Sequence, residues 1–110
     1  MIHNIDVLNE LVRMAEEAGG HIKIKNDPYM PLTVEILEDD QVTLCHYGEL
    51  NGDLMADPEV IFKLGTDLTQ AKAIYYRNDY VGYEKYEDCS PFADTWLQNI
   101  KEQGYVCMHN

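Results

Sequence analysis

The stretch that decides the fold is residues 51–62, which read Asn-Gly-Asp-Leu-Met-Ala-Asp-Pro-Glu-Val-Ile-Phe. It begins with Asn51-Gly52, a pair that favours a type I′ turn because both central positions of that turn need a positive φ. Pro58 has no amide hydrogen to donate to a sheet and disfavours helix at the residue before it. We therefore predict that residues 48–59 form an ordered connection and not a strand.

Short segments on both sides of this stretch have the composition of strands. They alternate apolar and polar residues, and many of their residues are β-branched or aromatic. The links between them are too short for crossover helices, so the sheet is predicted to be mostly antiparallel, with about five strands. The predicted strands cover residues 21–25, 32–37, 41–47, 60–64 and 71–77, with residues 81–86 as a last strand. Residues 26–31 predict a loop, and Gly82 indicates a bulge or a close contact.

A helix is predicted at each end of the chain. Residues 4–18 carry an apolar stripe at helical spacing, with Asn4 as the expected N-cap. Residues 91–103 carry a second stripe, and Ser90 is the expected N-cap there. The prediction is one α+β domain over residues 1–110, in which an N-terminal helix, the sheet and a C-terminal helix pack together with the helices on one face. Its core should bring together Leu11, Leu44, Phe62 and Trp96.

The charge restricts the partners. Twenty acidic against eight basic residues give a formal net charge of −12 and a pI near 4.4. A nucleic-acid backbone requires a basic footprint and an anionic membrane requires basic residues, so neither is an expected partner. A protein with a basic surface, a metal ion, or simple solubility remain as explanations for the acidity.

The cysteines and the N-terminus indicate a compartment. Cys45, Cys89 and Cys107 are odd in number and widely spaced, which predicts neither a disulfide framework nor a zinc site. Free thiols are typical of a reducing environment. The first residues lack the basic and apolar regions of a signal peptide, and no apolar run approaches the length of a membrane span. We expect the protein to be cytoplasmic.

Three carboxylates, Asp53, Asp57 and Glu59, resemble a calcium loop in number but lack the ligand order of an EF-hand. Since aspartate commonly caps turns, the structural interpretation is favoured: residues 51–59 should hold no metal, and Asp53 or Asp57 should accept hydrogen bonds from nearby backbone amides. The four histidines have no close pairing of the kind that zinc sites use.

Signs of catalysis are weak. Cys45 and His46 are neighbours on a predicted strand, so their side chains should point to opposite faces. The sequence has no nucleophile elbow, phosphate-binding glycine loop or dinucleotide fingerprint, and we expect no cofactor. An enzyme that uses one of the cysteines is kept as a reserve hypothesis.

Tyrosine is unusually frequent, with eight residues against two Phe and one Trp. Regular alternation would place Tyr76, Tyr80 and Tyr86 on one face of the sheet, and Tyr75 and Tyr83 on the other. A tyrosine-rich face flanked by acids suits a partner that carries Arg or Lys, although a core with hydroxyls at its rim has the same pattern.

The sequence also resembles a family of small uncharacterised domains in bacterial, plasmid and phage proteins. The matching residues are Asn51, Gly52, Asp53, Leu54, Met55, Asp57, Pro58, Glu59, Phe62, Tyr76 and Asp79. The family pattern has an aromatic residue or a proline just before the Tyr75 strand, whereas this chain has Ala71-Lys72-Ala73. The resemblance implies no activity, but it implies a gene carried on a mobile element.

Two functional hypotheses follow. The first is a non-catalytic protein-interaction module of a bacterial mobile element, with another protein as its partner. The second is a nucleic-acid-mimicking inhibitor of a host defence nuclease, of the anti-CRISPR or anti-restriction type, whose carboxylates occupy a basic groove as phosphates do. For either one, the candidate binding residues are Asp53, Asp57, Glu59, Tyr76, Asp79 and Tyr83.

Overall fold

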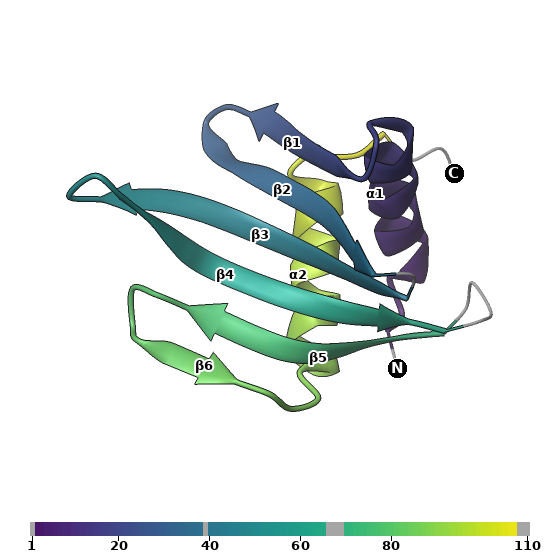
Figure 1. The fold of residues 1–110 in the computed structure, drawn as a ribbon. Coiled ribbons are helices and arrows are strands. Elements are labelled where there is room, and N and C mark those ends of the chain that lie inside the picture. The colour runs from purple at the N-terminus through teal and green to yellow at the C-terminus, as the bar shows by residue number, and fades with distance from the viewer. Residues whose placement is uncertain (1, 39, 66–69, 108–110) are drawn as a thin grey trace.

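A single antiparallel sheet with two helices on one of its faces forms the structure, a computed structural model that describes residues 2–38, 40–65 and 70–107 (Figure 1). The elements in chain order are α1 (Ile5–Glu17), β1 (His21–Asn26), β2 (Tyr29–Glu38), β3 (Gln41–Leu50), β4 (Asp53–Leu64), β5 (Ala71–Asn78), β6 (Tyr83–Lys85) and α2 (Ser90–Glu102). The α+β class and the helix at each end are confirmed, and the sheet has six strands where about five were predicted.

The strands lie in the sheet in the order of the chain, β1-β2-β3-β4-β5-β6, and every neighbouring pair is antiparallel. This meander follows from the short links, because a connection of a few residues can only return the chain beside the strand it has just left. β1 and β6 form the two edges. On β1 the side chains of Lys23 and Lys25 are exposed, and charged side chains of this kind discourage pairing with another strand.

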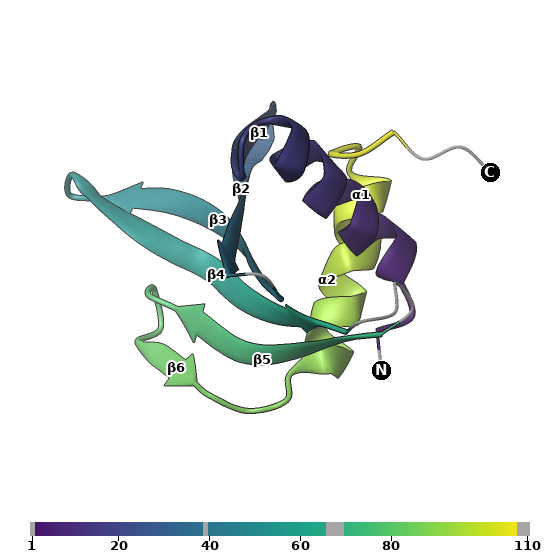
Figure 2. The ribbon, with the colours of Figure 1, turned by 45° about the vertical axis from the view of Figure 1, so that its right-hand side comes forward.

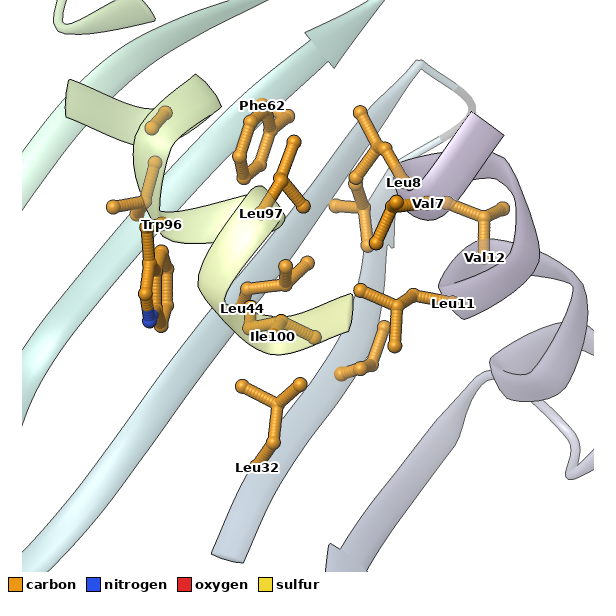
Figure 3. Close-up of a cluster of buried hydrophobic side chains, with 14 of the residues drawn as sticks. Val7, Leu8, Leu11, Val12, Leu32, Leu44, Phe62, Trp96, Leu97 and Ile100 are labelled. Atoms are coloured by element: carbon orange, nitrogen blue, oxygen red, sulfur yellow. The ribbon is translucent and has the colours of Figure 1, made fainter. Parts of the chain in front are cut away.

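The core lies between the sheet and the helices, as Figure 3 shows. Leu44 of β3 and Phe62 of β4 point toward the helices, where they belong to one buried cluster with Leu11 of α1 and Trp96 of α2. The predicted core is therefore confirmed. The C-terminal segment adds Tyr105 to the cluster, which packs there without forming a strand.

A carboxylate of α2, that of Asp94, binds the backbone just before α1. Asn4 precedes α1, but its side chain forms no cap of the expected kind. Instead Asp94 of α2 accepts hydrogen bonds at Oδ1 from the backbone amides of His3, at 2.9 Å, and Asn4, at 2.7 Å. The expected Ser90 cap is also wrong: Ser90 Oγ accepts from the amide of Ala73, which fixes the start of α2 to β5.

The largest correction concerns residues 48–59, which are not a separate connection. β3 continues to Leu50 and β4 begins at Asp53, so the link is the Asn51-Gly52 turn. Both turn residues have positive φ, 53° and 86°, as predicted for type I′.

Pro58 is accommodated in β4 by a bulge. Cys45 pairs with Glu59 and Tyr47 pairs with Ala56, so two β4 residues, one of them Pro58, lie opposite a single β3 residue. A bulge is one of the few places in a sheet where the missing proline amide is tolerated. The prediction failed because it treated the proline as a strand breaker. The resulting long β3–β4 hairpin reaches past the helices (Figures 1 and 2).

Two smaller boundaries also differ. The predicted loop over residues 26–31 is shorter, because β2 already begins at Tyr29. The predicted strand over residues 81–86 is reduced to β6, and Gly82 lies in the preceding turn with φ 64° and not in a bulge.

Candidate interaction surface

Arg77 is the centre of a polar cluster on the sheet face that the helices leave open. Its NH2 nitrogen lies 3.5 Å from Glu59 Oε1, and its Nε lies 3.4 Å from Asp79 Oδ1. Thr43 donates its hydroxyl to the other oxygen of Glu59 at 3.3 Å. Burial lowers the pKa of Arg77, but the carboxylates of Glu59 and Asp79 outweigh it and raise the pKa overall. The Arg77 guanidinium therefore stays protonated at physiological pH.

The other carboxylates of this region also have partners within the chain. Asp79 Oδ2 accepts from the amide of Ala56 at 2.8 Å, and the Asp79 amide donates to the Ala56 carbonyl at 2.9 Å. Asp57 Oδ1 accepts from the side-chain amide of Asn78 at 2.8 Å. The expected bond from a backbone amide to Asp57 is thus replaced by one from Asn78. These contacts fasten β4 at its bulge to the end of β5.

The thiol beside this cluster has low reactivity. Cys45 is buried on the open face, where desolvation raises its pKa to about 12. Burial also raises the pKa of the neighbouring Tyr47 to about 12. Since the thiolate is the nucleophilic form, Cys45 is a poor nucleophile near neutral pH.

Asp53 lies apart from the other candidate residues, at the tip of the β3–β4 hairpin, where it pairs with Leu50 beside the turn. Within residues 2–38, 40–65 and 70–107, no three His, Cys, Asp or Glu side chains are placed to hold a metal ion. The candidate carboxylates thus separate into an internally paired group and a solitary exposed residue.

The tyrosines divide between the faces differently from the prediction. Asn78 pairs directly with Tyr83 across a four-residue turn, so Tyr83 lies on the same face as Asn78 and as Tyr76, two residues before it. Tyr83 therefore lies beside Tyr76, with ring centroids 5.7 Å apart, and Tyr86 lies beside Tyr75, at 4.6 Å. The prediction was wrong because it carried simple alternation through the turn, whereas hairpin register depends on turn length.

Tyr76 and Tyr83 form a hollow with Phe92 from the first turn of α2. The rings of Tyr76 and Phe92 are nearly perpendicular, with an interplanar angle of 85° and centroids 5.2 Å apart. Tyr76 and Tyr83 meet at 64°. The hollow has a volume of about 170 Å³, and Lys85, Glu87 and Cys89 complete its lining. Phe92 and Tyr83 remain 44% and 45% exposed, so two of the three aromatic walls are available to a partner.

An ion pair lies at the rim of this hollow. Lys85 pairs directly with Tyr76 in the sheet register, and its Nζ lies 3.2 Å from Glu87 Oε1. Both side chains are 52% exposed. Exposed pairs of this kind contribute little to stability, so Glu87 can exchange its partner without damage to the fold.

The hollow rests on the aromatic part of the core. Phe92 stacks on Trp96 with centroids 6.4 Å apart, and Trp96 contacts the His46 ring at 5.4 Å. His46 in turn contacts Tyr105, and its Nδ1 lies 3.1 Å from the carbonyl oxygen of Pro31. These contacts continue the packing from the core to Phe92.

Phe92, Lys85 and Glu87 were not identified as candidate site residues from the sequence. Phe92 falls within residues 91–103, over which the sequence predicts an apolar helical stripe, and it lies one turn before Trp96. The available signal was its position directly after Pro91, which places it in the first turn of the helix.

A second hollow, of about 450 Å³, lies on the open face between β1 and the β3–β4 hairpin. Its lining mixes His21 and Lys23 with Glu35 and Glu49. Its lining includes one tyrosine, Tyr47, against two tyrosines and a phenylalanine in the first hollow.

Comparison with known proteins assigns the family. The model of a domain of unknown function, DUF6908, matches residues 3–106. The chain belongs to this family. No curated protein and no solved structure matches the chain significantly. The family description names no activity, and the mobile-element context inferred from the 51–62 signature therefore stays a prediction. Over the part of the chain that the structure describes, neither helix has the length and apolarity needed to cross a membrane.

Proposed function

We propose that this DUF6908 domain is a non-catalytic protein-interaction module that binds a protein with a basic surface. The observation that carries the proposal is the hollow of Tyr76, Tyr83 and Phe92, which has exposed aromatic walls and a replaceable carboxylate, Glu87, at its rim. Aromatic rings and acidic groups at one place favour Arg- and Lys-bearing partners over neutral ones. We place the module in the cytoplasm of a bacterium that carries a mobile element, in line with the resemblance of its 51–62 signature.

The chemistry of Cys45 and Cys89 supports a non-catalytic role. Burial raises the pKa of both Cys45 and Cys89. Cys89 Sγ contacts the backbone carbonyl of Tyr75 at 3.7 Å. A nucleophilic cysteine needs the opposite environment, one that favours the thiolate.

The distribution of acids favours this proposal over nucleic-acid mimicry. A mimic should gather Glu38, Asp39, Asp40, Asp53, Asp57, Asp79, Glu84, Glu87 and Asp88 in one band. Glu38 and Asp40 lie at the β2–β3 turn and Asp53 at the β3–β4 turn, which are opposite ends of β3. Asp39 lies outside the described residues. The remaining members lie in β4, in the β5–β6 turn, in β6 and in the segment before α2.

Several of these acids are also engaged within the chain. Glu84 accepts the hydroxyl of Tyr75, and Asp88 Oδ1 accepts the amide of Ser90 at 2.9 Å. A carboxylate that already accepts such bonds is less available to replace a phosphate. Because of these hydrogen bonds and the spread of the acids over the fold, nucleic-acid mimicry is the second candidate function.

Affinity capture with matched variants tests the proposal. Tagged wild-type protein, Phe92→Ala and Tyr86→Ala are exposed to a bacterial lysate at low and high salt. Tyr86→Ala is the control, because it removes an exposed tyrosine from the other face of the same hairpin. We expect a basic protein to be retained by wild type and Tyr86→Ala and lost by Phe92→Ala, with weaker capture at high salt.

Other outcomes would contradict the proposal in distinct ways. Capture that survives Phe92→Ala would show that the hollow is not the binding surface. A captured nucleic-acid-binding enzyme that is lost in Glu38→Gln with Asp40→Asn, but not in Phe92→Ala, would establish the mimic instead. Selective labelling of one cysteine by a thiol-reactive substrate probe, with no partner captured, would establish the enzyme.

A further inference from the structure

The hollow of Tyr76, Tyr83 and Phe92 has a shape and a charge that select one kind of cation. We infer that it binds the ammonium group of a lysine side chain on the partner protein, with Glu87 as its counter-ion. This inference rests on the proposed interaction function and specifies its ligand.

The arrangement of the rings carries the first step. Tyr76 meets Phe92 at 85° and Tyr83 at 64°, so both neighbouring rings stand steeply to the Tyr76 ring and each forms a corner with it. A planar guanidinium binds best flat against a single aromatic face. A compact ammonium makes cation–π contacts with several rings at steep angles, as in aromatic cages. The corner therefore favours lysine over arginine.

The chain's own Lys85 carries the second step. It lines the hollow, and its ammonium is held 3.2 Å from Glu87. The pKa of Lys85 is raised, first by the hydrogen bond to Glu87 and then by the charge of Glu87. An ammonium group is thus already stabilised at the rim, and a partner lysine would take over the same carboxylate.

The surroundings carry the third step, which favours a protein over a small free amine. The aromatic walls Tyr83 and Phe92 are 45% and 44% exposed. A free amine would leave this apolar surface in water, whereas a protein segment on either side of the lysine would cover it. Burial of that surface adds to the binding free energy that the ammonium alone supplies.

The test is a titration of the protein with blocked pentapeptides that carry one central residue between glycines. The central residue is lysine, its uncharged analogue norleucine, or arginine, and binding is followed by the aromatic NMR signals of Tyr76, Tyr83 and Phe92. We expect the lysine peptide to bind roughly three-fold or more tightly than the norleucine peptide, since cation–π and ion-pair contacts at exposed sites are each modest. The arginine peptide should bind more weakly than the lysine peptide.

Two substitutions at the rim should act in opposite directions. Glu87→Gln removes the counter-ion and should weaken binding of the lysine peptide roughly three-fold. Lys85→Met keeps the apolar stem but removes the competing ammonium, and it should tighten binding by a similar factor. Both side chains are half-exposed and belong to one surface pair, so the fold should be unaffected.

Results of three kinds would overturn the inference: equal binding of the norleucine and lysine peptides, tighter binding of the arginine peptide, or weaker binding after Lys85→Met. A small free cation such as methylammonium that binds as tightly as the lysine peptide would also overturn the choice of a protein ligand. If Phe92→Ala abolishes partner capture while no lysine peptide binds, the interaction function stands and this inference fails. If the lysine peptide binds while no protein is captured, the lysine site stands and the proposed interaction function fails.

Discussion

The two faces of the β5–β6 hairpin use similar residues for different purposes. On the open face, Arg77 is paired with two carboxylates, and Tyr75 donates its hydroxyl to Glu84. On the helix side, Tyr76 and Tyr83 leave a hollow whose one carboxylate, Glu87, is held by a single exposed lysine. The comparison teaches that the number of internal partners, and not the residue type, separates a structural acid from one that can serve a ligand.

Trp96→Ala should have the largest effect on stability, because Trp96 links the helix-side face to the core. It is 7% exposed and contacts both His46 and Phe92. Truncation of a buried aromatic residue should lower the free energy of unfolding by about 3–5 kcal/mol. Chemical denaturation measures this loss. Red-shifted native fluorescence of the wild type, or a loss of less than about 1 kcal/mol, would mean that Trp96 is not part of the core.

Arg77→Met tests the open face and should have the next largest effect. The substitution leaves Glu59 and Asp79 close together without their counter-charge. The cost should be about 1–3 kcal/mol, below that of a fully buried pair, because Arg77 is 34% exposed. Denaturation of the variant gives this value.

Lys63→Met is the matched control for Arg77→Met. Lys63 forms an exposed pair with Asp40 at 3.9 Å, so its loss should cost less than about 0.5 kcal/mol. Equal effects of the two substitutions would show that the Arg77 cluster contributes nothing beyond an ordinary surface pair.

The sequence predicted the covered side of the molecule better than the polar and aromatic surfaces. The core around Leu44, Phe62 and Trp96 follows from apolar periodicity, which depends only on nearby residues. The β4 bulge could not be predicted, because its Pro58 is accommodated by the pairing of Cys45 and Tyr47 in another strand.

The candidate site was predicted in part. Tyr76 and Tyr83 were identified, but their common face depends on the register across the β5–β6 turn. Asp57, Glu59 and Asp79 were identified as binding candidates, yet Arg77 and Asn78 hold them. Which acids find partners inside the fold is decided by tertiary contacts, and a local pattern does not contain that information.

The pH dependence of stability tests the burial of His46 on the helix side of the sheet. Burial lowers the pKa of His46, which lies between Trp96 and Tyr105. The unfolded chain then binds a proton at this histidine more readily than the folded chain does. The stability that neutral His46 contributes to the fold is therefore complete above pH ~6.5 and is lost as the pH falls below it. The free energy of unfolding, measured by denaturation at pH 7.5 and 5.5, should differ less between the two pH values for His46→Gln than for wild type. The exposed His21 supplies the control, and His21→Gln should keep the wild-type difference.

The smallest expected effects on stability come from Tyr83→Ala and Tyr86→Ala, one substitution on each face of the hairpin. Tyr83 is 45% and Tyr86 is 78% exposed, and each contacts one tyrosine of β5. Because the substituted side chains are themselves largely exposed, each variant should unfold within about 1 kcal/mol of wild type.

Their effects on binding should nevertheless differ. Tyr83→Ala removes one wall of the hollow and should weaken the binding of both the partner and the lysine peptide, whereas Tyr86→Ala should leave both unchanged. Denaturation followed by the peptide titration measures the two quantities on the same samples. If Tyr86→Ala weakens binding as much as Tyr83→Ala, the ligand is recognised by the whole hairpin and the distinction between its faces fails. If only Tyr83→Ala does so at matched stability, the loss arises from the hollow itself and not from damage to the fold.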